Sequence, residues 1–239
     1  MEKEKKIKVF LGITYVLIIS IFLWVFLNKY SFNEITSYEF IKNNRDYLIE
    51  IKNSNFFLII GIFFVSIILW VLLLGFGTPV CLLAGFIFGK WLGTILVVFG
   101  LSVGSTLLYI FANYFLKKFI EEKFANKFSS LSKKFKDNEF NFFLIYRFVG
   151  GIPFAISNIL PTLFNIKVNN FFFGSLLGLT PQLFVWVSLG SGLEKIIRAN
   201  EKAPSFSEVI LHPDIYIPII CFIILMVFVI IIKNLFYKK

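Results

Sequence analysis

Acidic residues and histidine are scarce in this chain. Its 239 residues include 14 Asp and Glu against 24 Lys and Arg, and a single histidine, His212. Residues 56–116 contain no Asp or Glu at all. An enzyme acting on phosphate esters needs a nucleophile or a base, usually His, or paired carboxylates that hold a metal ion. The sequence therefore argues against an enzyme, and we expect no catalytic residue, no metal site and no cofactor. Asp137 and Glu139 lie in a lysine-rich loop, where we expect solvated charges.

Cysteine is nearly absent as well. Cys81 and Cys221 are the only two, and both lie inside apolar segments. Two cysteines are too few for a disulfide framework or a metal site. We expect both to act as small apolar residues.

Apolar residues dominate the rest of the composition. They make up 58% of the chain, and the mean hydropathy is +0.83, far outside the range of soluble globular proteins. An apolar helix of about 20 residues crosses the hydrocarbon layer of a bilayer. The sequence therefore predicts an all-α polytopic membrane protein with about five transmembrane helices, at residues 7–27, 56–76, 91–116, 171–190 and 215–232.

The polar segments divide the chain into three parts. Residues 1–55 hold an N-terminal transmembrane helix, too long for the core of a signal peptide, and then an amphipathic helix expected at the membrane surface. Residues 56–195 form the membrane core. Residues 196–239 hold a polar loop and a C-terminal transmembrane helix.

Lysines are concentrated in one loop of this chain, whose formal net charge is +10. Residues 117–141 carry seven lysines, and apolar residues recur between them at roughly helical spacing. This pattern is typical of a basic amphipathic helix on an anionic membrane surface, so we expect anionic lipid headgroups as partners and no nucleic acid. The positive-inside tendency favours a topology with this loop and the lysine-ended C-terminus on the inner side.

The stretch FFLIYRFVGGIPFAISNILPTLFNIK, residues 142–167, differs from a plain spanning helix. It is apolar enough for membrane depth, yet it contains Arg147, two adjacent glycines and two prolines. The glycines and prolines destabilise a helix, and the arginine is costly to bury in hydrocarbon. Non-helical backbone is tolerated in the hydrocarbon layer only where protein buries it or water bathes it. We therefore predict a broken or re-entrant helix pair at 142–164 that lines an internal polar cavity. The alternative is one kinked helix in which Arg147 snorkels to the interface.

A second short apolar segment lies at residues 77–90. It opens with Gly-Thr-Pro and is too short to cross a bilayer, which predicts a half-helix or a re-entrant hairpin. Glycines follow every four residues, and we expect them to pack closely against another helix: Gly85, Gly89 and Gly93.

The predicted span at 171–190 is interrupted by Thr180-Pro181-Gln182. Proline and glutamine at mid-membrane depth indicate a second kink. This kink either lies beside the cavity or is a purely structural feature of helix packing.

Two groups of these residues occur in an order that resembles a known family. The first is TP-x4-AG-x3-G-x3-G, beginning at Thr78, followed by a Gly/Ser-rich span and the basic loop. The second is YR-x3-G-x-PF-x3-N, beginning at Tyr146. Together they resemble the DedA/VTT-domain superfamily of SNARE-associated Golgi protein-like membrane proteins, over about residues 56–195.

The resemblance implies two oppositely inserted re-entrant hairpins, near 77–90 and 142–164, packed against each other. Characterised members move lipids, as scramblases in eukaryotes or as polyprenyl-phosphate and phospholipid flippases in bacteria. The implied location is a bacterial inner (plasma) membrane. The family's arginine, hairpin proline and polar hairpin residue map onto Arg147, Pro153 and Asn158.

This sequence departs from the family pattern in two places. Better-characterised bacterial members carry acidic residues at the first hairpin, proposed to couple transport to protons, and residues 56–116 have none. Many relatives have a glycine shortly after the asparagine, where this chain has Pro161 and Thr162. The first departure argues against proton-coupled transport.

Elementary chemistry gives lipid transport a candidate site. A phosphate headgroup needs a partly wet path with a cationic partner, and arginine presents a planar fork that suits phosphate oxygens. Half-helix N-termini offer free N–H groups to the same anion. The expected headgroup site consists of Arg147, Gly151, Pro153, Asn158, Thr162, Thr78 and Pro79. A small-solute or ion channel or transporter, or a non-catalytic membrane scaffold, is the alternative function, and a homo-oligomer stays open.

Overall fold

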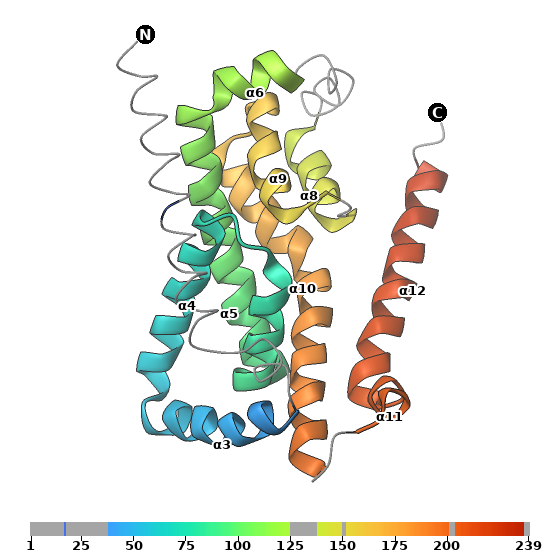
Figure 1. Ribbon diagram of the computed structural model, residues 1–239. Helices are drawn as coiled ribbons and strands as arrows, with labels where there is room; N and C mark the ends of the chain where they lie inside the picture. The colour runs from blue at the N-terminus through green and yellow to red at the C-terminus, as the bar shows by residue number, and fades with distance from the viewer. Residues whose placement is uncertain (1–16, 18–37, 125–137, 150–151, 201–203, 237–239) are drawn as a thin grey trace. The chain divides into compact units, whose positions relative to one another are not determined.

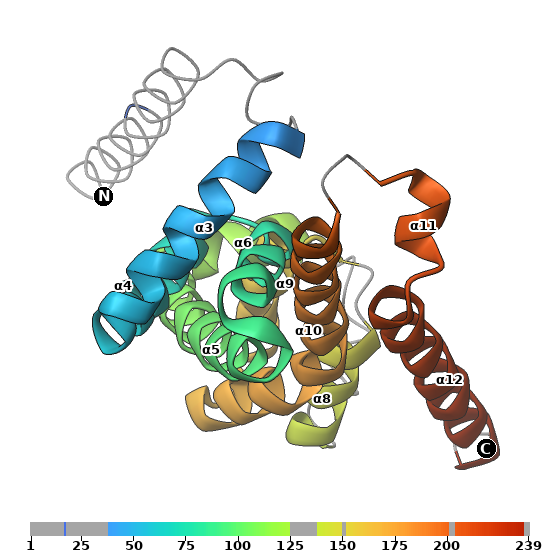
Figure 2. The same cartoon turned by 90° about the horizontal axis from the view of Figure 1, so that it is seen from below.

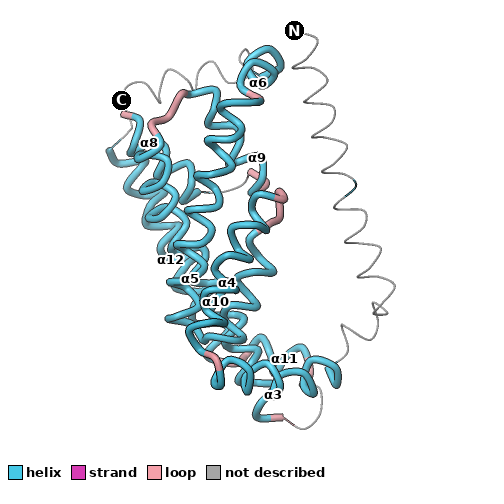
Figure 3. Tube along the Cα trace, turned by 90° about the vertical axis from the view of Figure 1, so that its left-hand side faces the viewer, coloured by secondary structure: helices cyan, strands magenta, loops and turns pink. Residues whose placement is uncertain are grey.

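The computed structural model describes residue 17 and residues 38–124, 138–149, 152–200 and 204–236. All regular structure in these ranges is helical (Figure 3), so the all-α prediction is confirmed at this coarse level. The chain divides into two compact units, residues 1–50 and 51–239. The described part of the first unit is Leu17 and most of helix α3 (Tyr38–Ser54), in the segment predicted to be amphipathic. Apart from Leu17, the predicted span at 7–27 lies outside the described residues.

The second unit is built on two long helices. α10 lies along α5, α4 packs on α5, and α8 packs on α10 (Figures 1 and 2). The elements of this unit, in chain order, are α4 (Phe56–Leu72), α5 (Gly77–Phe115), α6 (Lys117–Phe124), α8 (Glu139–Val149), α9 (Phe154–Ile159), the 3-10 helix η2 (Leu160–Phe164), α10 (Val168–Ala199), α11 (Phe206–Ile210) and α12 (Pro213–Phe236).

Helix α5 folds back on itself at Gly89. The backbone there has φ 76° and ψ 175°, a conformation that only glycine adopts easily. A Cβ on Gly93 would lie 2.7 Å from the carbonyl oxygen of Ala84, and one on Gly77 would lie 3.3 Å from the Leu101 side chain. Both pairs are nearly symmetric about Gly89, so residues 77–88 (the first arm) run antiparallel to residues 90–115 (the second arm) (Figure 1).

This geometry corrects the role predicted for Gly89. A Cβ on Gly89 would meet no atom within 4 Å, so the residue is needed for its backbone conformation and not for close packing. Gly85 does meet another helix: its Cβ would lie 1.9 Å from the carbonyl oxygen of Val187 in α10. Gly190 of α10 approaches the first arm in the same way, with 2.1 Å to the carbonyl oxygen of Leu82. Backbone therefore touches backbone where the first arm meets α10.

The core around this contact is apolar. Cys81, Val97 and Val187 are fully buried within it, while Cys221 is exposed on α12. A second cluster of aromatic residues joins α5, α8 and the start of α10, with Tyr109 stacked on Phe171 at 4.4 Å between ring centroids.

Two of the described helices, α5 and α10, are long and apolar enough to cross a membrane. A third span results if the successive segments Lys42–Ser54 and Phe56–Leu72 are counted as one. Because α5 folds back at Gly89, we assign its crossing to the second arm, whose length of about 39 Å still suffices. The chain is thus an integral membrane protein, with two or three candidate membrane-spanning helices among the described residues.

Candidate functional site

The segment at 142–164 is broken into separate pieces. α8 ends at Val149, and Pro153 is extended, with φ −50° and ψ 136°, before α9 begins at Phe154. α9 passes into η2, which ends at Asn165 in the left-handed conformation. The alternative of a single kinked helix is therefore wrong. Proline has no N–H to donate, so Pro153 and Pro161 both fall where a helix starts.

This broken segment lines a cavity of about 220 Å³, as the sequence predicts. The other walls are the start of α5 and the middle of α10. Most of the lining is apolar or aromatic, and the exceptions with strongly polar side chains are Thr78, Tyr146, Arg147, Ser157 and Gln182. The described lining holds one cationic side chain and no carboxylate.

Arg147 is buried at the end of α8, with 2% of its surface exposed. The alternative in which Arg147 snorkels to an interface is wrong, and the predicted position beside the cavity is the one observed. Gly178 of α10 makes this position available, because a Cβ there would lie 2.7 Å from the Cβ of Arg147. The arginine thus reaches the cavity from between α8 and α10.

Three contacts fix the guanidinium. Its Nη1 donates to Ser157 Oγ at 3.0 Å, and Ser157 Oγ in turn donates to the Phe154 carbonyl at 2.8 Å. The rings of Phe143 and Phe171 lie 5.1 and 4.8 Å from the guanidinium carbon, within the range of cation–π attraction. These contacts hold the plane of the group and leave one edge of it unused.

That unused edge carries Nε and Nη2. Neither atom has a hydrogen-bond partner among the described residues, although both are buried. Nε and Nη2 point the same way from a planar guanidinium, so together they can donate two parallel hydrogen bonds to one oxyanion. The first turn of α5, with Gly77 and Thr78 on the cavity wall, adds backbone N–H groups that have no partner within the helix. Both features favour an anion in the cavity.

Comparison with known proteins fits this geometry. Residues 74–192 match the family model of the VTT domain, from just before the first arm of α5 to the last third of α10. The chain is a VTT-domain protein. The earlier resemblance to the DedA/VTT superfamily is thereby confirmed, and the VTT domain contains every wall of the cavity.

Several curated relatives are similar to this chain. A "Transmembrane protein 41 homolog" of Caenorhabditis elegans is 25% identical over 152 residues, 61% of this chain and 61% of the relative. A protein of the same name in Dictyostelium discoideum is 26% identical over 169 residues, 67% and 49% of the two chains. "Transmembrane protein 41B" of Mus musculus is 28% identical over 132 residues, 54% and 45%. The match thus spans about half to three-fifths of these relatives. No solved structure matches the chain.

The VTT domain brings together some of the predicted site residues and separates others. Arg147 and Thr78 both line the cavity, while Gly151 lies outside the described residues. Pro79 and Pro153 shape the starts of α5 and α9 but do not reach the lining. Asn158 and Thr162 are fully buried elsewhere and also stay off the lining.

Sequence reasoning missed several lining residues. Ser157, which holds Arg147, directly precedes the predicted Asn158, and no sequence signal distinguishes the two neighbours. Tyr146 and Trp186 were also missed, and the Tyr146 hydroxyl donates to the Ser157 carbonyl at 3.3 Å. Gln182 had a signal, since it follows the proline that indicated a kink, and it lies on the cavity wall in α10.

Glu139 differs from the solvated charge expected in the basic loop. Its Oε1 accepts hydrogen bonds from the backbone N–H of Lys167 at 2.7 Å and from Asn170 Nδ2 at 2.8 Å. The carboxylate at the start of α8 therefore fastens the N-terminus of α10, where a negative charge is favourable. Asp137 lies outside the described residues.

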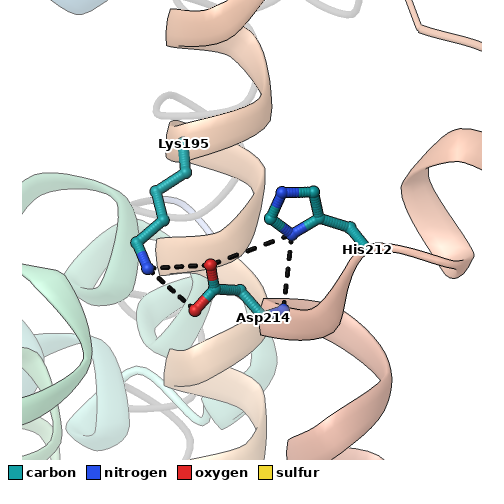
Figure 4. Close-up of polar contacts among 3 residues, drawn as sticks. All are labelled: Lys195, His212 and Asp214. Atoms are coloured by element: carbon teal, nitrogen blue, oxygen red, sulfur yellow. Dashed lines mark hydrogen bonds and ion pairs between the residues drawn. The ribbon is translucent and has the colours of Figure 1, made fainter.

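A polar cluster joins α10 to the start of α12, beyond the end of the VTT domain (Figure 4). Lys195 donates to both carboxylate oxygens of Asp214 at 2.8 Å, and His212 Nδ1 accepts from the Asp214 backbone N–H at 3.3 Å. The hydrogen bond from Lys195 lowers the pKa of the Asp214 carboxyl, aided by attraction to Lys195, His212 and Lys90 and opposed by partial burial. We assign this cluster a structural role.

Proposed function

We propose that this VTT-domain protein moves lipids, phospholipids or polyprenyl phosphates, between the leaflets of a membrane. The observation that carries the proposal is the buried Arg147, whose Nε–Nη2 edge has no hydrogen-bond partner among the described residues, at a cavity whose described lining holds no carboxylate. A lipid phosphate is an oxyanion that cannot cross hydrocarbon unaided, and this edge gives it a partner at depth. Thr78, Ser157 and Gln182 supply uncharged polar groups around it.

The arrangement in the membrane belongs to the same proposal. About five helices span the bilayer, and the first arm of α5 and the α8–α9–η2 segment are re-entrant. In this arrangement the cavity between them lies at membrane depth. Lipid tails would stay in the hydrocarbon while the headgroup passes along the polar side chains.

The surroundings follow from charge. We propose that the lysine-rich segment 117–141 contacts anionic headgroups, and that the membrane is the bacterial inner (plasma) membrane. Lys117 and Lys118 begin this segment on α6. The protein itself is proposed not to be an enzyme, since transport between leaflets makes and breaks no covalent bond.

The test is lipid movement in reconstituted liposomes. Liposomes carry a fluorescent phospholipid or a fluorescent polyprenyl phosphate, and a membrane-impermeant quencher reports the label that becomes accessible from outside. Wild type, Arg147→Ala and the control Arg198→Ala are compared at equal protein density. Arg198 is an exposed arginine in the last turn of α10, so its removal changes net charge equally without touching the cavity.

We expect wild type and Arg198→Ala to expose inner-leaflet label, and Arg147→Ala to be about ten- to hundredfold slower, the effect of losing a hydrogen bond to a charged group. Equal rates in all three proteins would remove Arg147 from the path. No movement of any lipid phosphate above empty liposomes would overturn the proposal and leave a solute channel or a membrane scaffold.

A further inference from the structure

Asn158 and Thr162 present polar groups in a place where the cavity does not reach. Both side chains have 0% exposure. Neither the amide oxygen and nitrogen of Asn158 nor the hydroxyl of Thr162 has a hydrogen-bond partner among the residues that the structure describes. Their neighbours on α9 and η2 pack on α5.

The facing surface of α5 carries the same kind of group. Ser102 and Ser105 have 0% exposure, and within the described ranges their hydroxyls find no partner. Tyr109 lies four residues beyond Ser105, on the same face of the helix. Its hydroxyl donates to the carbonyl of Ile166 at 2.6 Å, just after η2, and its ring stacks on Phe171 of α10. Since α9 and η2 both contact α5, we take Ser102 and Ser105 to face the segment that holds Asn158 and Thr162.

A buried polar group with no partner destabilises a protein by about 1–3 kcal/mol, so four such side chains at one interface call for a ligand. The chemistry of Asn158 decides its class. Its Oδ1 needs a donor and its Nδ2 needs an acceptor. A cation would satisfy the oxygen atoms only, and the positive charge of Arg147, held by the adjacent Ser157, opposes it. Water both donates and accepts.

We propose that Asn158, Thr162, Ser102 and Ser105 enclose a water-binding site between α5 and the α9–η2 segment. Buried waters of this kind typically make about three hydrogen bonds to groups that would otherwise be unsatisfied. The site is separate from the cavity and does not depend on what the cavity transports. Ser157, which accepts a hydrogen bond from the Arg147 guanidinium, lies on α9. Waters that fix the position of α9 therefore also fix this partner of Arg147.

X-ray radiolytic footprinting tests this site directly, since hydroxyl radicals formed from a bound water label the side chains beside it even when they are buried. Wild-type protein in detergent micelles is irradiated and digested, and labelling is read by mass spectrometry at Leu160 and Pro161. Val71, fully buried in the apolar core between α4 and α5, is the dry reference.

The variant is Thr162→Val with Ser105→Ala, which removes two hydroxyls with little change of shape. Its matched control is Thr180→Val, because the Thr180 hydroxyl donates to the Leu176 carbonyl of its own helix. We expect labelling at Leu160 or Pro161 well above Val71 in wild type and control, reduced severalfold in the variant. We also expect the variant's thermal midpoint to fall by a few degrees.

Three outcomes would overturn the proposal. Labelling of Leu160 and Pro161 no higher than that of Val71 in wild type would mean a dry interface. Equal labelling in wild type and variant would mean that these side chains do not hold the water. A thermal midpoint that rises in the variant would mean that the hydroxyls have no partner of any kind. The wild-type result stands even if the variant fails to fold.

Discussion

The positively charged side chain of Arg147 is buried, and its contacts with the protein are weak. One neutral hydroxyl and two aromatic rings contact its guanidinium, and the described surroundings offer no carboxylate to it. Burying an ion without a counter-charge costs several kcal/mol even after relaxation. Residues that destabilise the fold in this way are usually retained for function. Stability and transport should therefore respond to this residue in opposite directions.

Replacement of Arg147 by methionine tests that opposition. Methionine keeps much of the volume and can contact the rings of Phe143 and Phe171, but it removes the charge. We expect Arg147→Met to be as stable as wild type or up to about 4 kcal/mol more stable, as when other buried ions are replaced by apolar residues. Thermal unfolding in detergent measures this, with Arg198→Met as the exposed control, expected within about 0.5 kcal/mol.

The same variant should lose lipid movement in the liposome assay. A thermal midpoint several degrees below that of wild type would contradict the interpretation, because it would mean that Arg147 stabilises the fold. A stable variant with undiminished transport would separate the buried charge from the path.

At the scale of elements, the feature that builds the site is the folded-back helix α5. The first arm brings Thr78 and a helix N-terminus to the cavity, and it lies against α10 through glycines on both sides. Two different properties of glycine are used: backbone conformation at Gly89, and lack of a side chain at Gly85. These properties can be measured apart.

Alanine substitutions at three glycines should give three different results. Gly85→Ala places a Cβ 1.9 Å from a backbone oxygen, so we expect a loss of at least about 1–3 kcal/mol and displacement of the first arm. Gly89→Ala meets no atom and should cost only its backbone strain, about 1–3 kcal/mol. Gly61→Ala, in α4 with no atom within 4 Å, is the control and should stabilise by roughly 0.5–1 kcal/mol.

Thermal midpoints rank these variants, and cysteine accessibility separates the two costly ones. Cys81 borders the cavity but has no exposed surface, so we expect a maleimide to reach its thiol only when the first arm is displaced. Labelling of Cys81 is expected in Gly85→Ala and not in Gly89→Ala. The control background carries Cys221→Ser, because that thiol is exposed. A Gly85→Ala protein as stable as wild type would contradict the close contact with α10.

Helices and their breaks could be predicted from the sequence better than the positions of side chains. The breaks at Gly77–Pro79 and at Pro153 and Pro161 could be predicted, since proline and glycine act through the local backbone wherever the chain lies. Burial of Arg147 followed from its place beside those breaks. The choice between Ser157 and Asn158 could not be predicted, because α9 is only six residues long and its rotation depends on packing against α5 and on hydrogen bonds from α8. The turn at Gly89 could not be predicted, because glycines at every fourth residue, Gly85, Gly89 and Gly93, are also typical of close helix packing.

At the scale of the whole molecule, α12 joins the membrane core through its first turn. Gly192 of α10 packs against Ile215, since a Cβ on Gly192 would lie 2.7 Å from the Ile215 side chain. Lys195 donates a hydrogen bond to Asp214 nearby. Farther along, α12 exposes Ile219, Ile220, Ile223 and Ile224. A membrane would cover those residues. The polar cluster at the start of α12 is therefore a main contact between that helix and the rest of the chain.

Acid should weaken this contact. The pKa of Asp214 is lowered in the folded protein, so its pairing stabilises the fold fully above the unfolded carboxyl pKa of about 3.9, and this stabilisation is lost as pH falls from that value through the lower folded pKa. We expect Asp214→Asn to unfold at a lower temperature than wild type at pH 6–7, and the difference to begin to shrink near pH 4 and to vanish only below the lowered folded pKa of Asp214. Glu208→Gln serves as a carboxylate control outside the pair. A difference at pH 3 as large as the one at pH 6–7 would contradict a charged pair.

The contact between Gly85 and Val187 also has a consequence in time. About a hundred residues separate the two positions, and a ribosome adds about 5–20 residues per second, so roughly 5–20 s pass before α10 exists. During that interval the second arm can already pair with the first, but the glycine face of the first arm lies bare. Assembly of the cavity is therefore one of the last steps of synthesis. A nascent chain that stalls before residue 187 therefore carries this arm without its partner helix.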